Sequence, residues 1–259
     1  MQKIIRSAML MLALVSAAVM LPAFAQSCNK ASPAYTVALL ELYTSEGCDS
    51  CPPADRFVSS LYKTSGLGAD QVVPLSLHVD YWDYIGWKDV FAKPLFTARQ
   101  RWLADQVSSH TVYTPEVFVA GRELRDWRGG IAASVKRINS MPAQANISIT
   151  LDKAADNKLK VGLTGKSAQA SKLYFALVEN SLVSNVKAGE NRGVTLQHDY
   201  VAREWGEPIS LPRGASESAS RQISLPANAA TKNLAVTAFV QSDKGEVLQA
   251  LTLPLCQPM

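Results

Sequence analysis

The sequence is poor in the residues that most often bind metals, with four cysteines and three histidines in 259 residues. A structural zinc site at Cys48 and Cys51 would need a second pair of ligands, usually another Cys-x-x-Cys or two histidines. The other cysteines, Cys28 and Cys256, lie at opposite ends of the chain, and the histidines are scattered. The sequence therefore argues against structural zinc, and we expect neither a resident metal ion nor an organic cofactor.

The sequence also lacks a strong charge of either sign. It has 26 Lys and Arg residues against 22 Asp and Glu residues, which gives a formal net charge of +4. Lys3 and Arg6 belong to a segment that we expect to be removed, and subtracting their two charges from +4 leaves about +2. A nearly balanced chain gives no reason to expect nucleic acid or an anionic membrane as a partner.

Residues 1–25 have the pattern of a signal peptide. Two basic residues precede an apolar run over residues 8–21, and the segment ends in Ala23-Phe24-Ala25, a small-x-small cleavage site. The apolar run is short for a bilayer span, so a retained anchor is the weaker alternative. We therefore expect cleavage near Ala25 and a periplasmic or secreted protein that does not associate with the membrane afterwards.

Cys28 and Cys256 are expected to form a structural disulfide. An exported protein folds in an oxidising compartment, where disulfides persist. The alternative is a pair of free, exposed thiols, which exported proteins seldom keep. On the chain-entropy model, a bond that joins both ends of the chain stabilises by roughly 5 kcal/mol at most.

The most informative segment is residues 41–55, ELYTSEGCDSCPPAD. Val37–Tyr43 has the length and apolar content of a buried strand, and Ala54–Gly66 has apolar residues at helical spacing. Cys48 and Cys51 therefore lie where a strand turns into a helix, with two prolines in the first helical turn. Two sulfurs at this spacing can close a disulfide, open it and pass it to another protein. A structural disulfide that never exchanges is the plain alternative.

The two cysteines are expected to have different roles. Cys48, nearer the helix start, should be the exposed sulfur that attacks, and Cys51 should resolve the mixed disulfide. The positive end of the helix favours a thiolate at Cys48, but Glu46 and Asp49 oppose it. We therefore expect a Cys48 thiol that is only modestly acidified.

The chain changes character near Met141. Before it, strand-like and helix-like segments alternate, which predicts an α/β layer fold; the later segments are Val72–Val79, Pro94–Val107, Glu116–Gly121 and Gly130–Ile138. Pro74 cannot donate to a central ladder, so we expect Val72–Val79 to be an edge strand.

From Ala145 onward the pattern predicts strands alone. Seven short runs are separated by Gly, Pro, Asn and Ser, which is typical of a β-sandwich; the runs are Ile147–Leu151, Leu159–Leu163, Leu173–Val178, Val194–Val201, Ile223–Leu225, Leu234–Val240 and Val247–Leu253. His198 lies in one of these runs, and we expect it to be a surface strand residue.

Thr114-Pro115, followed by the strand EVFVAG, is the second informative motif. A proline here is commonly just a strand start. The combination of strand, CDSC, helix and Thr-Pro-strand nevertheless resembles the thioredoxin-like superfamily, whose members place a cis-proline opposite the Cys-x-x-Cys. Since cis X–Pro bonds are uncommon, it is the resemblance that implies a cis Pro115 and a Thr114 that presents its backbone to a bound peptide.

Four segments resemble, more specifically, a bacterial family of exported proteins, domain-of-unknown-function family 1223. They are ELYTSEGCDSCPPAD, HVDYWDYIGWKD (78–89), TARQR (97–101) and VYTPEVFVAG (112–121). The resemblance implies a thioredoxin-like fold and export but no established reaction. With the strand and helix pattern, it predicts an α/β thioredoxin-like domain over 26–141 followed by an all-β sandwich domain over 145–259.

Polar and aromatic residues follow the predicted strand Val72–Val79. His78 and Asp80 fall at its carboxyl end, the edge where ligands bind in open α/β sheets. We interpret His78 as a proton shuttle for Cys48, or otherwise as a residue with only local hydrogen bonds. Asp80, with the aromatic residues Tyr81, Trp82 and Trp87, could receive an extended peptide or cover the disulfide. These aromatic rings could equally close the seam with the second half of the chain.

Three functions remain open from the sequence. The first is an exported thiol–disulfide oxidoreductase that acts on a protein or peptide and exchanges with an unidentified redox partner. The second is capture of a soft metal such as Cu(I) by the two thiolates and His78. The third is a binding module without enzymatic activity, in which Cys48–Cys51 is a structural disulfide.

Overall fold

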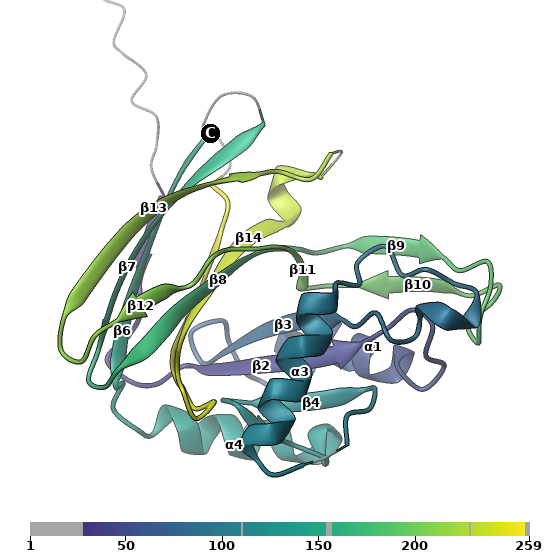
Figure 1. The fold of residues 1–259 in the computed structure, drawn as a ribbon, viewed down its shortest axis with the longest axis horizontal. Helices are drawn as coiled ribbons and strands as arrows, with labels where there is room; N and C mark the ends of the chain where they lie inside the picture. Colours follow the sequence, from purple (N-terminus) through teal and green to yellow (C-terminus); the bar gives the residue numbers. More distant parts are fainter. Residues whose placement is uncertain (1–27, 110, 154–156, 228, 257–259) are drawn as a thin grey trace, which may run out of the picture.

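The computed structural model describes residues 28–109, 111–153, 157–227 and 229–256 (Figure 1). The predicted signal peptide and its cleavage site lie outside these residues. The first half contains β1 (Cys28–Ala31), β2 (Ala38–Thr44), α1 (Pro52–Ser59), α2 (Leu61–Thr64), β3 (Val72–His78), η1 (Asp83–Ile85), α3 (Pro94–Gln106), β4 (Glu116–Val119), β5 (Arg122–Glu123) and α4 (Trp127–Asn139).

Strands dominate the rest of the chain. They are β6 (Ala145–Lys153), β7 (Lys158–Ser167), β8 (Ser171–Glu179), β9 (Leu182–Asn185), β10 (Thr195–His198), β11 (Val201–Trp205), β12 (Ile209–Leu211), β13 (Ser216–Ser224), β14 (Leu234–Ser242) and β15 (Val247–Pro254), with one 3-10 turn, η2 (Thr231–Asn233). The predicted run Val194–Val201 is divided between β10 and β11, and the pattern missed β9 and β12. Among the residues that the structure describes, every helix is too short or too polar to span a bilayer.

The predicted fold class, an α/β thioredoxin-like domain followed by a β-sandwich, is wrong. The described chain is mostly β-strand, with four α-helices, and its strands lie in several sheets. Nine strands from both halves form one sheet in the order β15-β14-β8-β11-β3-β2-β4-β5, with β12 paired to β8. Strand β1, from the first half, belongs instead to a second sheet, β1-β6-β7-β13.

The large sheet is continuous because β8 and β14 have two buried faces. On β14, Val236 and Ala238 pack against the second sheet, whereas Phe239 packs in a cluster with β2, β3 and α3. The alternation in β14 correctly indicated one apolar face. The opposite face carries smaller and polar residues as well as Phe239, which the pattern alone did not mark as buried.

Strand β3 is not an edge strand, contrary to expectation. It pairs in parallel with β2 along its whole length and with β11 at a single register position, Ser76 opposite Val201. The Ser76 N–H donates to the Tyr200 carbonyl at 2.8 Å. Pro74 is compatible with this arrangement because β11 meets the strand only beyond the proline, which cannot donate.

The helices cover both faces of the β2–β3 region. Helices α1, α2 and α4 pack on one face through a cluster that includes Leu40 and Val58. Helix α3 packs on the other face, where Phe96 and Leu103 meet Leu39, and it lies across the strands in Figure 1. Ala54–Gly66, expected to be one helix, is divided between α1 and α2.

The predicted disulfide between Cys28 and Cys256 is confirmed, with a Cα–Cα distance of 5.9 Å. It joins the start of β1 to the segment that follows β15, and so bridges the two sheets at the ends of the described chain. The Cys256 N–H also donates to the Cys28 sulfur at 3.1 Å.

The shared sheet predicts that the first half does not fold alone. A fragment of residues 26–141 would expose the face of β2 and β3 that Phe239 and Ala250 cover. We expect the full mature chain to unfold in one cooperative transition by circular dichroism, and the fragment to show none. A fragment with its own sigmoidal transition and dispersed amide resonances would contradict this expectation.

Candidate functional site

A disulfide between Cys48 and Cys51 lies where β2 turns into α1, as the sequence indicates, with a Cα–Cα distance of 5.5 Å. The turn is held by backbone bonds from Cys48 N–H to the Ser45 carbonyl at 3.2 Å and from Cys51 N–H to the Cys48 carbonyl at 3.3 Å. Cys51 is the N-cap residue of α1, which begins with Pro52. A proline fits this first turn because its missing N–H would have no helical partner.

Thr114 lies beside the disulfide, and Pro115 follows it just before β4. The Thr114–Pro115 bond is cis, as the resemblance implied, and the Thr114 carbonyl oxygen lies 3.8 Å from the Cys48 sulfur. The indole N–H of Trp82 donates to the Thr114 hydroxyl at 2.8 Å. Thr114 is therefore fixed beside Cys48 through both its backbone and its side chain.

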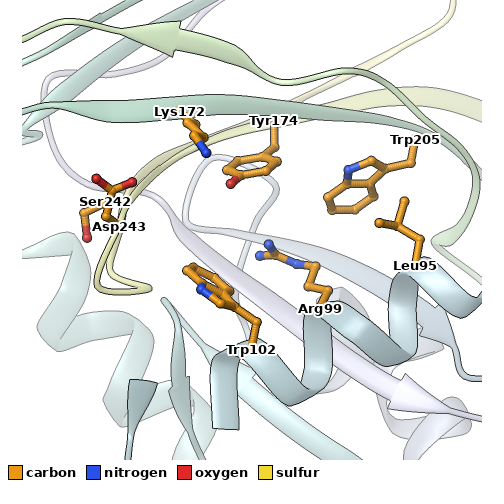
Figure 2. A pocket seen from close by; sticks show the side chains of 8 residues that line it. All are labelled: Leu95, Arg99, Trp102, Lys172, Tyr174, Trp205, Ser242 and Asp243. Carbon is orange, nitrogen blue, oxygen red and sulfur yellow. The ribbon is translucent and has the colours of Figure 1, made fainter. Parts of the chain in front are cut away.

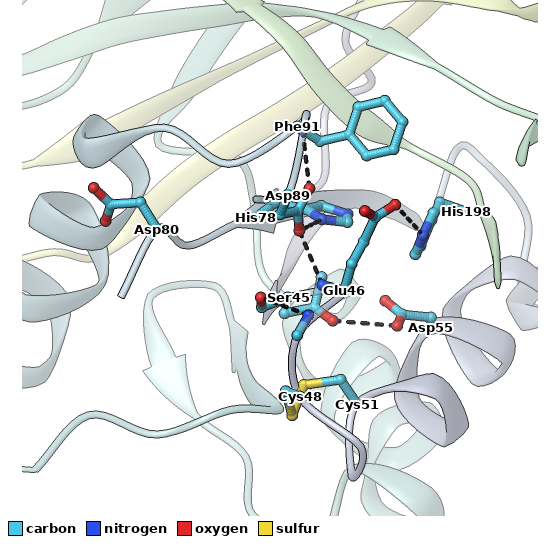
Figure 3. Close-up of polar contacts among 12 residues, drawn as sticks. Ser45, Glu46, Cys48, Cys51, Asp55, His78, Asp80, Asp89, Phe91 and His198 are labelled. Atoms are coloured by element: carbon cyan, nitrogen blue, oxygen red, sulfur yellow. Dashed lines mark hydrogen bonds and ion pairs between the residues drawn. A yellow bond between two sulfur atoms is a disulfide. The ribbon is translucent and has the colours of Figure 1, made fainter. Parts of the chain in front are cut away.

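Beneath the turn, His78 and Asp89 form a buried ion pair, with 2.6 Å between His78 Nδ1 and Asp89 Oδ2 (Figure 3). Burial alone would lower the pKa of His78, but the charge and hydrogen bond of Asp89 outweigh it and raise that pKa. Burial opposes the charge of Asp89 as well, yet His78 and the N–H groups of Glu46 and Phe91 lower the Asp89 pKa. Both pKa shifts favour the state in which His78 is protonated and Asp89 is ionised.

His198 belongs to the same cluster, and the expectation that it is a surface residue is wrong. It is only 2% exposed, and its ring centroid lies 4.9 Å from that of His78. Its Nε2 lies 3.3 Å from Glu46 Oε1, close enough for an ionic contact but without hydrogen-bond geometry. Glu46 is held from the other side by the Trp87 indole N–H, at 2.7 Å. His198 is buried because the β9–β10 hairpin folds back over α1.

Asp55 is the third acidic group of this cluster and was not anticipated. It lies one helical turn after Cys51, on the same helix face, and accepts a hydrogen bond from the Thr44 hydroxyl at 3.2 Å. Burial raises the pKa of Asp55, although His198, His78 and the Thr44 bond act to lower it. A carboxyl on the otherwise apolar inner face of α1 was the available sequence signal.

The β9–β10 hairpin covers the disulfide. The side-chain amide of Asn191 donates to the carbonyls of Glu46 and Cys48, both at 2.9 Å, and Glu190 accepts from the Asp49 N–H at 3.1 Å. Both cysteines are 0% exposed. The expectation that Cys48 is exposed is therefore wrong for this oxidised form, because the covering residues are some 140 positions away along the chain.

The side chains of the loop after β3 mostly form hydrogen bonds within the protein. They therefore hold the neighbouring segments in place and leave little of the loop free for a ligand. Trp82 and Trp87 bond to Thr114 and Glu46, Tyr81 is half-buried, and Asp80 accepts from the Thr97 hydroxyl at 2.5 Å. Within this described loop Tyr84 is strongly exposed, at 82%. Recognition of a peptide by these residues stays a prediction. The described contacts of His78 are with Asp89, Phe91 and His198 rather than with Cys48.

Glu116, next to Pro115, is a further titratable group that the sequence did not single out. It is buried on β4, where Gln100 donates to it at 2.6 Å. Burial is the main cause that raises the pKa of Glu116, to about 7. Displaced pKa values gather at functional sites more often than elsewhere, and this one belongs to the residue that follows the cis-proline.

Comparison with known proteins supports the family and the fold. The model of a family described as "Protein of unknown function (DUF1223)" matches residues 39–241. An X-ray structure of a protein from Agrobacterium tumefaciens is similar, with 21% identity, a TM-score of 0.61, and coverage of 88% of this chain and 98% of that one. At this identity the likeness concerns the fold alone.

A domain of the outer membrane lipoprotein Omp28 from Porphyromonas gingivalis is a weaker match, with 15% identity, a TM-score of 0.27, and coverage of 44% of this chain and 88% of that one. This likeness is too distant to support an inference. No curated protein matches the chain.

The His78–Asp89 pair predicts a pH-dependent contribution to stability. A raised His78 pKa stabilises the fold fully below its unfolded value of 6.5, and this stabilisation is lost as pH rises through the folded pKa. A lowered Asp89 pKa stabilises fully above 3.8, and this stabilisation is lost as pH falls through the folded pKa. We expect Asp89→Asn to lower the free energy of unfolding by about 3–5 kcal/mol between these limits, and by less at alkaline pH.

Denaturant unfolding of both proteins from pH 4 to pH 9 measures this difference. Asp105→Asn, which removes an exposed carboxylate from α3, is the matched control and should change stability by less than about 0.5 kcal/mol. A loss for Asp89→Asn that is constant across the range would show that the pair is not charged in the folded protein.

Proposed function

Because the chain belongs to the DUF1223 family, whose description assigns no reaction, we propose its function from its own site: thiol–disulfide exchange with a protein or peptide substrate at Cys48–Cys51. The observation that carries this proposal is the buried cluster of titratable groups that packs behind the turn carrying the disulfide (Figure 3). A disulfide that only staples the chain needs no such groups, whereas exchange produces and consumes thiolates and protons.

The exchange balances without a cofactor. A substrate thiolate attacks the Cys48 sulfur and forms a mixed disulfide, while the Cys48–Cys51 bond breaks and Cys51 leaves as a thiolate. A second substrate thiolate then attacks the substrate sulfur of the mixed disulfide, and Cys48 leaves as a thiolate. The substrate is oxidised to a disulfide, and the pair is reduced to two thiols once two protons are taken up. The reverse sequence oxidises the pair.

The buried cluster can donate one of the two protons that the reduced pair takes up. Cys51 is the N-cap residue of α1, and Asp55 follows it by one turn of that helix. Because burial raises the pKa of Asp55, its carboxyl holds a proton more readily than an exposed aspartate and can give that proton to a leaving thiolate. The neighbouring His78–Asp89 ion pair is balanced in charge within itself, so it adds no net charge beside the carboxyl that gives up the proton.

Thr114 offers a place for the substrate backbone. Its carbonyl lies beside the Cys48 sulfur, and its side chain is anchored by Trp82. An extended peptide that pairs with the backbone at Thr114 would bring its own sulfur next to Cys48, in the manner of strand addition. The predicted export is compatible with this proposal, because disulfides of the protein and of its substrates persist in an oxidising compartment.

A structural disulfide in a binding module is the competing function, and one observation favours it: both cysteines are 0% exposed, and Asn191 holds their turn through the Cys48 carbonyl. Exchange therefore requires residues around the disulfide, the hairpin among them, to move. The copper proposal has less support, because among the described residues no cluster of His, Cys, Asp and Glu has the geometry to hold a metal ion.

The proposed exchange predicts that Cys51→Ser traps its substrate. Cys48 should then form mixed disulfides that nothing resolves, and these should survive alkylation and separate on a non-reducing gel. Cys48→Ser is the matched control and should trap nothing. If iodoacetamide labels Cys51 faster than Cys48 in the reduced protein, the two roles are reversed; if the native pair resists strong reductants until the protein unfolds, the structural disulfide is the correct function.

The hairpin contacts predict that Asn191 limits the rate of reduction. Asn191→Ala removes two hydrogen bonds to the turn, each worth about 0.5–1.5 kcal/mol net, which should make opening about tenfold more frequent. We expect dithiothreitol to reduce Cys48–Cys51 about tenfold faster in this variant. Asn146→Ala, the same change at an exposed position of β6 outside the hairpin, should leave the rate unchanged. Equal rates for both variants would show that the hairpin does not control access.

A further inference from the structure

A cavity of about 400 Å³ lies between α3, the strands β8 and β11, and the turn that follows β14 (Figure 2). It is separate from the disulfide. Its walls are the half-buried rings of Trp102, Tyr174 and Trp205, and Arg99 lies between them. Lys172 and Asp243 stand at one end of the cavity. A concave site with aromatic walls and few polar groups is the usual form of a small-molecule site.

Arg99 is buried, and its bonds leave one nitrogen unused. Its Nε donates to Glu41 Oε1 at 2.6 Å, and its Nη1 donates to Gln241 Oε1 at 3.0 Å. Its Nη2 is buried and has no hydrogen-bond partner. Since buried charged donors are nearly always satisfied, an acceptor oxygen from a ligand would complete the set. The flanking rings of Trp102 and Tyr174 are side chains that can move aside to admit it.

The rings already hold a cation, which is Arg99 itself. Its Cζ lies 5.4 Å from the Trp205 ring centroid, 5.5 Å from that of Tyr174 and 6.0 Å from that of Trp102. These distances are within or at the limit for cation–π attraction. A cationic ligand would have to compete with the guanidinium for the same ring faces, so the site favours a neutral or anionic ligand.

The charged side chains at the end of the cavity further restrict which kind of ligand it can bind. Lys172 is exposed on β8 and reaches the cavity opposite Trp102, where Figure 2 shows its amino group beside Tyr174. Asp243 is the opposing charge at the same end. Glu41 Oε1 accepts from Arg99 and from the Tyr43 hydroxyl, whereas Glu41 Oε2 is buried without a partner among the described residues. The two cationic donors that remain for a ligand are therefore Arg99 Nη2 and the Lys172 ammonium.

We propose that this cavity binds a small molecule with a flat apolar body and one carboxylate. The body lies between the rings of Trp102, Tyr174 and Trp205, and the carboxylate accepts from Arg99 and Lys172. This proposal is independent of the exchange reaction, because none of its residues touches the disulfide cluster.

The first test compares three probes that share one ring system. Naphthalene-2-carboxylate, 2-naphthamide and 2-naphthylmethylamine are titrated into the mature protein with intact disulfides, and binding is followed by tryptophan fluorescence and calorimetry. We expect saturable binding of the carboxylate, binding of the amide weaker by about tenfold because it cannot form the charged hydrogen bonds, and no saturable binding of the amine. Failure of the carboxylate to saturate, or tighter binding of the amine, would overturn the proposal.

The second test locates the site with variants that keep the fold. Lys172→Met removes an exposed charge from the cavity and should weaken the carboxylate about threefold without affecting the amide. Lys160→Met makes the same change at an exposed position of β7, outside the cavity, and should have no effect. Asp243→Asn removes the opposing charge and should strengthen carboxylate binding. Equal affinities for the two lysine variants would place the binding elsewhere and overturn the proposal.

The variant Arg99→Lys tests the role of the Arg99 guanidinium in ligand binding. It retains a positive charge towards Glu41 but lacks Nη2, and its fold is checked by circular dichroism. If the variant folds, it should lose the preference for the carboxylate over the amide. A folded Arg99→Lys that keeps the full preference would overturn the role of Nη2. If it does not fold, the lysine and aspartate variants decide the question.

Discussion

The whole architecture depends on the burial of β8 and β14 on both faces. One face of these strands closes the core with β6 and β7, and the other meets β2, β3 and α3 around Phe239. Neither half of the chain can therefore bury its apolar surface without the other. The same arrangement fixes the Glu41–Arg99–Gln241 chain of bonds, which joins β2, α3 and β14 in the protein interior. The cavity beside Arg99 exists only because strands from both halves meet there.

Local features of the chain were predictable, and long-range ones were not. The strand at Val37–Tyr43, the disulfide at Cys48–Cys51 and the helix that begins at Pro94 each follow from periodicity and from proline placement within a few residues. Pro74 was misread because its effect depends on where a partner strand begins, and β11 meets β3 only past the proline. No local signal shows that a strand with one apolar stripe will have its other face covered as well.

The residues of the candidate site likewise fall into two groups: those that local motifs predict and those that only long-range packing brings to the site. Cys48, Cys51 and Pro115 lie in motifs that can be recognised, and the structure brings them together. Asn191 and His198 come from a hairpin that pairs within itself and whose strands carry only short alternations. Their place over the turn is set by packing against α1 and by bonds to backbone carbonyls, which leave no mark in the hairpin sequence. His198 consequently looked like any histidine on a surface strand.

The buried polar cluster near the disulfide lowers the stability of the folded protein. This cost in free energy is an argument about the function of the cluster. His78, Asp89, His198, Glu46 and Asp55 are all buried, and several of their polar atoms lack partners among the described residues, including His78 Nε2 and both ring nitrogens of His198. An unsatisfied buried polar atom costs about 1–3 kcal/mol, and apolar residues of similar size would stabilise a purely structural turn more effectively. The contacts of the hairpin explain how such a cluster stays buried, but not why it is there. Proton transfer to a leaving sulfur is a use that needs these groups near the disulfide, out of bulk water and incompletely bonded.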